Sequence, residues 1–342
     1  MTGAAEVGRT FGTSRIGDNP STAVAGAQLS HSVSWSGGRI ALVVAAIGLL
    51  AAAPGAGRLG LAERYGLNPG GTAGMGLVVI AAALAVIGLL LLVGGLGYYV
   101  LAPAFMGERM ARHDVGSHRL VIATTVLIVL LANAGPVAYS AIAGVRGLCS
   151  ISGFLTAIVS VNLTLLAVTY VRFIRPGVLT TSDLGLDRSR LARHVGIGLI
   201  VGVGVLVISA LIQASLRAIG VQQTQLVDLQ CVRDFPLPGF LAVVLAGGVL
   251  APIAEELYFR GFVFRSYLQT RGPLVAYGVT PLLFAGLHLN LPALLPIVVL
   301  ALIFSWVFQR TGTIVPSIVG HGVNNTAAFC ILYFTSTPLG AG

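Results

Sequence analysis

The stretch that decides the fold is residues 237–254, LPGFLAVVLAGGVLAPIA, which contains no charged side chain. Two adjacent glutamates, Glu255 and Glu256, follow it directly. A helix that crosses a bilayer needs roughly 20 mainly apolar residues, and this run is close to that length. Lipid offers the backbone no hydrogen bonds, so such a run must be helical. We therefore predict a membrane helix that ends at the two glutamates.

Runs of the same kind recur along most of the chain. Hydrophobic residues make up 56% of the sequence and charged residues only 9%, whereas soluble domains carry about 25% charged residues. The predicted fold class is all-α, a polytopic transmembrane helical bundle of about eight or nine spans. The first span is short and contains Pro54, which allows a tilted, re-entrant or interfacial helix. The candidate spans are residues 40–55, 75–102, 120–142, 148–171, 195–218, 237–254, 273–288, 291–308 and 313–334.

The distribution of arginine predicts how the bundle is oriented. The net charge is +9, and every basic residue other than histidine is an arginine. Arginines gather in the segments 103–119 and 172–194, which lie on the amino-terminal side of the membrane when nine spans are counted. The positive-inside rule makes that side cytoplasmic. We expect a multi-pass protein of the cell membrane with a cytoplasmic amino terminus and an outer carboxyl terminus.

The remaining compositional features exclude other classes of protein. No basic patch interleaved with aromatic residues is found, so the lipid bilayer is an expected partner and nucleic acid is not. Residues 1–38 are rich in Gly, Ser, Thr and Ala without an apolar core, which predicts a disordered cytoplasmic tail. Cys149, Cys231 and Cys330 lack the spacing of metal ligands. The predicted orientation places the first two cysteines on the outer side, where a disulfide between them is possible.

Glu255 and Glu256 are the first candidates for chemistry. Ionisable groups at membrane depth are costly and need a partner or water, which makes them functional candidates by default. Glu256 and Arg260 are four residues apart on one helix face and can form an ion pair. Glu255 points about 100° away from Glu256 and is left without a local cation. The alternative is that both glutamates cap a span and pair with Arg260 or Arg265.

Two later helices carry the other candidates. Phe284 and His288 share one helical face, and the small residues between them allow close approach. His321 and Asn325 share a face of the last span, with Asn324 as a less favoured neighbour. Each histidine could instead be structural, by bonding a carbonyl or another helix. Together, however, a carboxylate, two imidazoles and an amide supply what water activation and oxyanion stabilisation need.

These residues, taken in order, resemble a known family. Residues 255–261 (EELYFRG), the pair Phe284 and His288, and the pair His321 and Asn325 resemble the three motifs of the CPBP family. This family comprises the CAAX proteases and bacteriocin-processing enzymes, also called Abi or type II CAAX endopeptidases. The stretch 309–312 (QRTG) is also similar to that family. The resemblance covers residues 237–334 and leaves the first two-thirds of the chain unassigned.

The resemblance implies an intramembrane endopeptidase with a polar cavity open to the cytoplasm. It implies that Glu255 activates water, that His288 helps to hold this water, and that His321 and Asn325 support the oxyanion. Glu256, Arg260 and Phe284 would be structural or would orient the substrate. The chain then divides into the tail 1–38, amino-terminal transmembrane helices 39–225 and a CPBP-like catalytic core 226–338.

The resemblance leaves the substrate open. The Ala-, Gly- and Arg-rich composition is typical of a bacterial protein from a GC-rich genome, which makes the bacterial plasma membrane the expected location. A peptide or a membrane-associated protein is then a more suitable substrate than a prenylated protein. The competing class is a non-catalytic transporter or membrane scaffold with the same polar cavity. Transporters commonly show two repeated halves, which this sequence lacks.

The number of candidate ligands bears on whether a metal takes part. Catalytic zinc usually has three protein ligands and a water. Glu255, His288 and His321 could supply a zinc site, but Glu255 could not then also serve as the base. No HExxH spacing is present either. We therefore predict a glutamate mechanism without a cofactor, with zinc at Glu255, His288 and His321 as the alternative.

Overall fold

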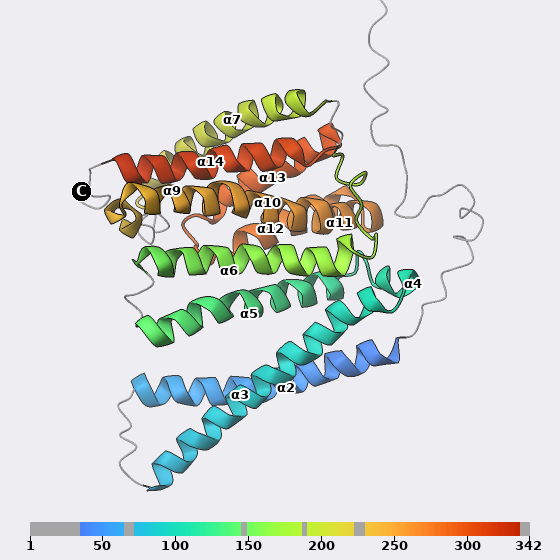
Figure 1. Ribbon diagram of the computed structural model, residues 1–342, viewed down its shortest axis with the longest axis vertical. Coiled ribbons are helices and arrows are strands. Elements are labelled where there is room, and N and C mark those ends of the chain that lie inside the picture. The colour runs from blue at the N-terminus through green and yellow to red at the C-terminus, as the bar shows by residue number, and fades with distance from the viewer. Residues whose placement is uncertain (1–34, 65–71, 145–148, 187–189, 222–229, 336–342) are drawn as a thin grey trace, which may run out of the picture.

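The computed structural model describes residues 35–64, 72–144, 149–186, 190–221 and 230–335, and every element in these ranges is a helix (Figure 1). The predicted all-α membrane bundle is thereby confirmed. Most of the predicted tail, residues 1–34, lies outside the described residues. The first described helix begins at Ser36, so the last three residues assigned to the tail are helical.

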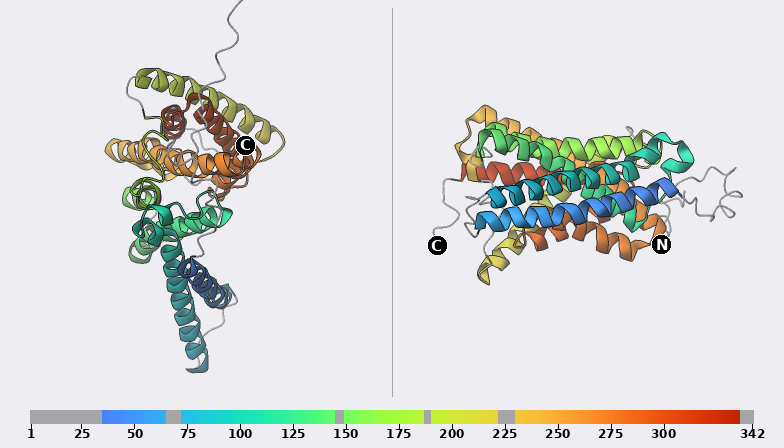
Figure 2. Two further views of the ribbon diagram at one scale, coloured as in Figure 1. Left: turned by 90° about the vertical axis from the view of Figure 1, so that its right-hand side faces the viewer. Right: turned by 90° about the horizontal axis from the view of Figure 1, so that it is seen from below.

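The amino-terminal helices form a pair that stands apart from the rest. The pair consists of α2 (Ser36–Arg64) and α3 (Thr72–Leu101), so the helix that contains the first predicted span is much longer than that span. Figures 1 and 2 show this pair extending away from the other helices, and its main contact with them is between α3 and α5. We call it the α2–α3 pair.

The middle of the chain supplies three long helices and several short ones. α5 and α6 pack on each other, and α6 also contacts the helix that carries the two glutamates. The predicted loops 103–119 and 172–194 are partly helical, because short helices occupy both. The elements are η1 (Ala102–Phe105), α4 (Glu108–Ala111), α5 (His118–Ala143), α6 (Ile151–Thr169), η3 (Tyr170–Ile174), α7 (Leu191–Ala218) and η5 (Gln230–Asp234).

The helix that carries the two glutamates does not end where we predicted. It continues through five consecutive segments from Leu237 to Thr270, and we call it the 237–270 helix. The glutamates lie in the middle of this helix. Glu256 and Arg260 are fully buried and paired with each other rather than directed to an interface. The segments are α9 (Leu237–Leu245), η6 (Ala246–Leu250), α10 (Ala251–Glu256), η7 (Leu257–Phe264) and α11 (Arg265–Thr270), of which η6 and η7 are π-helical.

Three further helices complete the described chain, namely α12 (Pro273–Gly286), α13 (Leu294–Thr311) and α14 (Val315–Phe334). Among the described residues, six helices are long and apolar enough to cross a membrane, so the predicted count of eight or nine spans is not confirmed. α12 has only 14 residues. α14 is long enough, but it is not among the six and carries His321, Asn324 and Asn325 within its span.

Glycines hold α14 between α7 and the 237–270 helix. An added Cβ at Gly198 or Gly202 of α7 would lie within 2.9 Å of α14 atoms. On the other side, an added Cβ at Gly248 of η6 would lie 2.3 Å from Thr326 Oγ1. Only glycine permits this spacing, so α14 is fixed closely beside the segment that carries the glutamates.

A disulfide ties together two segments at the end where α9 begins. Cys149 and Cys231 are bonded, as the predicted orientation allows, and link the start of α6 to η5. Next to it lies a small hydrophobic cluster that includes Phe154, Phe235 and Phe240. The boundary that we predicted at residues 225 and 226 lies outside the described residues.

Candidate active site

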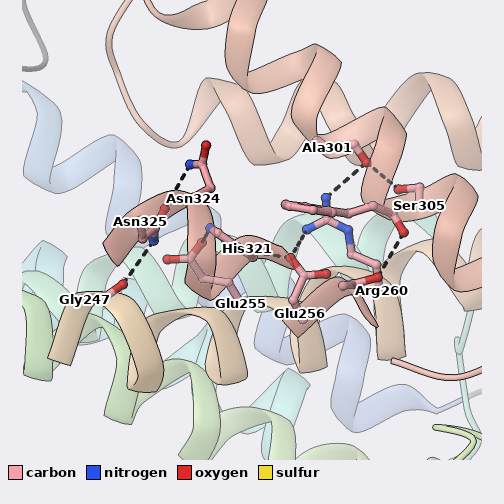
Figure 3. Close-up of polar contacts among 11 residues, drawn as sticks. Gly247, Glu255, Glu256, Arg260, Ala301, Ser305, His321, Asn324 and Asn325 are labelled. Atoms are coloured by element: carbon pink, nitrogen blue, oxygen red, sulfur yellow. Dashed lines mark hydrogen bonds and ion pairs between the residues drawn. The ribbon is translucent and has the colours of Figure 1, made fainter. Parts of the chain in front are cut away.

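The centre of the candidate site is a buried ion pair on the 237–270 helix. Arg260 Nη1 donates to Glu256 Oε1 at 2.8 Å, and both side chains are fully buried (Figure 3). The predicted pair is therefore present. Arg260 Nη2 also donates to the Ala301 carbonyl at 3.1 Å, and the guanidinium lies 4.9 Å from the centre of the Phe284 ring. These contacts compensate the cost of placing a charge in a dry environment.

His321 joins this pair from α14. Its Nδ1 lies 2.9 Å from Glu256 Oε1, the same oxygen that accepts from Arg260. An ionised carboxylate only accepts hydrogen bonds, so Nδ1 must carry a proton. The ring also stacks on Phe304, with centroids 5.5 Å apart. Glu256 and Phe304 therefore fix the orientation of the imidazole, and its Nε2 faces the other way.

Glu255 is the group that Nε2 of His321 faces. The distance from Nε2 to Glu255 Oε2 is 3.8 Å, which is too long for a hydrogen bond but within the distance of an ion pair with a protonated imidazole. This Oε2 atom is buried and has no hydrogen-bond partner among the described residues. The Glu255 side chain as a whole is 18% exposed, in contrast to the fully enclosed Glu256. Two neighbouring carboxylates thus have different environments, as the sequence predicted.

His288 reaches the same region from the end of α12. Its Nδ1 lies 2.9 Å from the Phe284 carbonyl, which can only accept, so this nitrogen carries the proton. In the neutral ring Nε2 is then an acceptor. The Phe284 ring lies 5.0 Å from the His288 ring and 5.9 Å from the His321 ring. Phe284 therefore spaces the two histidines as well as covering Arg260.

Asn325 contacts a different stretch of the 237–270 helix. Its Nδ2 donates to the Gly247 carbonyl at 3.0 Å, and Asn324 Nδ2 lies 3.3 Å from Asn325 Oδ1 (Figure 3). Gly247 belongs to the π-helical segment η6, two helical turns before Glu255. An amide nitrogen has two protons, so Asn325 keeps a second donor. Its role in supporting an oxyanion stays a prediction.

The site depends on residues that sequence reasoning did not identify. Tyr258 OH and Thr125 Oγ1 are 2.7 Å apart, which ties η7 to α5. Tyr258 lies inside the motif that we quoted, so its position was a usable signal. Phe304 and Ala301 gave none, because a phenylalanine or a backbone carbonyl in an apolar helix has no distinctive pattern.

The spacing of the candidate ligands bears on a metal site. Among the described residues, no group of three His, Cys, Asp or Glu side chains is close enough to hold a metal ion. Glu255, His288 and His321 are therefore not gathered as a ligand set in this arrangement. Whether a metal is needed stays a prediction.

Comparison with known proteins identifies the same part of the chain. Residues 237–327 match the family model described as type II CAAX prenyl endopeptidase Rce1-like. The UPF0177 protein YxdF of Lactococcus lactis subsp. lactis (strain IL1403) is 32% identical over 79 residues, which are 23% of this chain and 43% of that protein. No solved structure matches the chain.

This region belongs to the CPBP family. The matched residues contain all three motifs, from Glu255 to Asn325, and the site built from them lies inside the match. The CPBP region does not include the α2–α3 pair, α5, α6 or α7. The match to YxdF spans less than half of that relative's length.

Proposed function

We propose that the protein is an intramembrane endopeptidase in which Glu255 activates the hydrolytic water. The observation that supports this most strongly is the 3.8 Å separation between Glu255 Oε2 and His321 Nε2. Glu255 thus presents a carboxylate oxygen without a hydrogen-bond partner, among the described residues, to an imidazole whose orientation is fixed by Glu256. The membership of residues 237–327 in a membrane protease family agrees with this chemistry.

In the proposed reaction each catalytic side chain has one role. Glu255 removes a proton from water as the water oxygen attacks the peptide carbonyl carbon, and His288 Nε2 accepts a second hydrogen bond from that water. The carbonyl oxygen becomes an oxyanion. The proton held by Glu255 then passes to the departing nitrogen as the carbon–nitrogen bond breaks. The products are a carboxylic acid and an amine, and transfer of the acid proton to the amine gives a carboxylate and an ammonium group.

His321 is placed to stabilise the oxyanion. A protonated His321 donates from Nδ1 to Glu256 and from Nε2 to the developing negative charge. Donors that are fixed before reaction cost no reorganisation when the charge appears, which is why such contacts are effective in dry sites. The second N–H of Asn325 is the further candidate donor. Glu256 and Arg260 act on the reaction through His321 and through the position of the helix.

We further propose that the substrate is a peptide or a membrane-associated protein and that the chain resides in the bacterial plasma membrane with its amino terminus in the cytoplasm. The bonded cysteines support this orientation, because disulfides persist on the oxidising side of the membrane. The end of the bundle near Arg172 and Arg175 then faces the cytoplasm.

Two experiments test the proposed function. Membrane proteomes of cells that produce wild-type protein or Glu255→Ala should differ in new peptide termini, which appear only with the wild type. Identical termini would contradict proteolysis. The purified protein should also keep its activity on a substrate found in this way after exhaustive chelation. One tightly bound zinc per chain, with activity lost on its removal and restored by zinc, would replace the glutamate mechanism with a metal-dependent one.

A further inference from the structure

Helix α5 carries a narrow exposed stripe within its membrane span. Within residues 120–128, only Ile122 and Val126 are exposed, and every other residue is buried. The exposed face continues through Val129 and Asn133. Ile122 is 60% exposed, and Val126 and Val129 are each 38% exposed. We call Ile122, Val126, Val129 and Asn133 the α5 stripe.

The helices next to α5 leave the Asn133 end of the stripe open. An added Cβ at Gly135 would lie 2.1 Å from Ser160 Oγ, so α6 packs on the face of α5 that carries Gly135. Gly135 is two residues after Asn133 and therefore points about 200° away from it. Figure 1 shows α3 meeting α5 near its start at His118 and diverging from it toward its end at Ala143. This end of the stripe thus faces the lipid around the bundle.

The spacing of the stripe is that of a seam between two helices. Ile122 and Val129 are seven residues apart, and so are Val126 and Asn133. A seven-residue repeat keeps side chains on the line of contact between two helices that cross at about 20°, which is the usual geometry of membrane bundles. The stripe therefore has the period of a surface that packs along another helix.

Asn133 is the residue of the stripe that does not suit lipid. It lies fifteen residues after His118 and ten before Ala143, or about 22 and 15 Å, so it is close to the middle of the span. Its Nδ2 donates to the Val129 carbonyl at 2.8 Å, and this is the only hydrogen bond of the side chain among the described residues. Oδ1 and the second N–H are left at a depth where polar groups are costly and usually face protein.

We propose that two copies of this chain associate through the α5 stripe, with the two Asn133 side chains hydrogen-bonded to each other. Both copies have the same orientation in the membrane, so a two-fold axis along the membrane normal places each residue of α5 level with itself. A carboxamide donates and accepts, so two of them satisfy each other. A partner of different sequence would need its own polar group at this depth, whereas a second copy supplies it by symmetry. This association does not depend on the proposed peptidase activity.

Oxidative cross-linking in native membranes tests the contact. Val129→Cys is made in a Cys330→Ser background that keeps the Cys149–Cys231 disulfide, and an oxidant that enters the membrane is added. Leu131→Cys is the matched control, because Leu131 is 37% exposed at nearly the same depth but points about 200° away from Val129. We expect covalent dimers with Val129→Cys and none with Leu131→Cys. Equal yields at the two positions, or cross-links from Val129→Cys to other proteins alone, would overturn the proposal.

A second measurement tests the role of the carboxamide. Energy transfer between labelled copies in lipid vesicles gives the dissociation constant of the dimer for wild type, Asn133→Leu and the control Leu131→Ala. Asn133→Leu should weaken association about three- to twentyfold, the range expected for one interhelical hydrogen bond in a membrane. Asn133 is exposed and bonds only within α5, so thermal unfolding of the variant should match wild type. Unchanged association of Asn133→Leu, or wild-type protein that stays monomeric at high density in the vesicles, would refute the Asn133 pair.

Discussion

The 237–270 helix and the α2–α3 pair lie in the same bilayer, but different interactions hold them in place. The 237–270 helix carries Glu255, Glu256 and Arg260 and is fixed by ion pairs, hydrogen bonds and aromatic rings from α12, α13 and α14. The α2–α3 pair is fixed by backbone contact. An added Cβ at Gly48 would lie 2.4 Å from the Leu92 backbone, and one at Gly88 would lie 2.5 Å from the Ala52 backbone.

This difference explains why the family model matches the 237–270 helix but not the α2–α3 pair. A polar network in hydrocarbon needs particular side chains at particular positions, because each unpaired group is costly. Its motifs are therefore recognisable, and the family match covers residues 237–327. Close packing of small residues in lipid can be achieved by many sequences. The family match does not include the α2–α3 pair, although these two helices pack closely on each other.

The largest expected effect concerns the carboxylate at the site. Glu255→Gln should reduce turnover by about 10²–10⁴ or more, because general-base catalysis contributes about that factor. Stability should stay close to wild type, since Glu255 Oε2 has no hydrogen bond among the described residues to lose. Initial rates and thermal unfolding of the purified protein measure both quantities. Glu108→Gln on the exposed α4 is the control. Comparable turnover by Glu255→Gln would remove Glu255 from the mechanism.

The second effect compares two ion pairs of the same spacing. Arg260→Ala removes the arginine paired with the buried Glu256, leaving only the contact with His321, and should lower the free energy of unfolding by about 3–5 kcal/mol. Arg112 and Glu108 have the same four-residue spacing at 3.1 Å but are 33% and 73% exposed, so Glu108→Ala, which spares the bond from Arg112 to the Gly177 carbonyl, should cost only about 0–1 kcal/mol. Denaturant or thermal unfolding in detergent measures both. A stable but inactive Arg260→Ala would instead assign this arginine to substrate binding.

The third effect concerns the outer end of the bundle. The Cys149–Cys231 disulfide closes a long loop, so replacing both cysteines by serine should lower stability by about 2–4 kcal/mol. Cys330→Ser, which removes an unbonded cysteine, is the control. Thermal unfolding compares the variants with wild type.

The predicted orientation of the chain in the membrane can be tested by cysteine labelling. A cysteine placed at the exposed Ser182, between α6 and α7, should be labelled only after the cytoplasmic face is made accessible. Labelling of this position in intact cells by an impermeant reagent would reverse the orientation. Such a result would place the arginine-rich end outside, contrary to the positive-inside rule.

Much of the fold was predictable because lipid leaves the backbone few choices. Each predicted span contains a helix, and the all-α class was confirmed. The end of the helix at residue 254 was predicted wrongly, because a rule based on hydropathy treats Glu255 and Arg260 as residues that leave the membrane. Their burial depends on Ala301, Phe304 and His321, which come from other helices and cannot be located by local sequence.

Only the part of the site that follows from helical spacing could be predicted from the sequence. The pairing of Glu256 with Arg260 follows from helical spacing alone, and it is present. The contact of Asn325 with Gly247 was not predictable, because it depends on the π-helical segment η6 and on the closeness of α14. The roles of Glu255, His288, His321 and Asn325 in catalysis stay predictions.

The smallest expected effect tests whether the α2–α3 pair is independent of the site. Gly88→Leu places a side chain against the backbone of Ala52 and Gly48, so the helices must separate, at a cost of about 1–3 kcal/mol typical of overpacking. Gly94→Leu is the matched control, since an added Cβ there meets nothing within 4 Å. Hydrogen exchange should report faster opening of α2 and α3 in Gly88→Leu only. Turnover should be unchanged in both variants, because the pair contacts the bundle mainly through α3 and α5, away from Glu255. Loss of turnover in Gly88→Leu with a normally protected 237–270 helix would show that the pair takes part in handling the substrate.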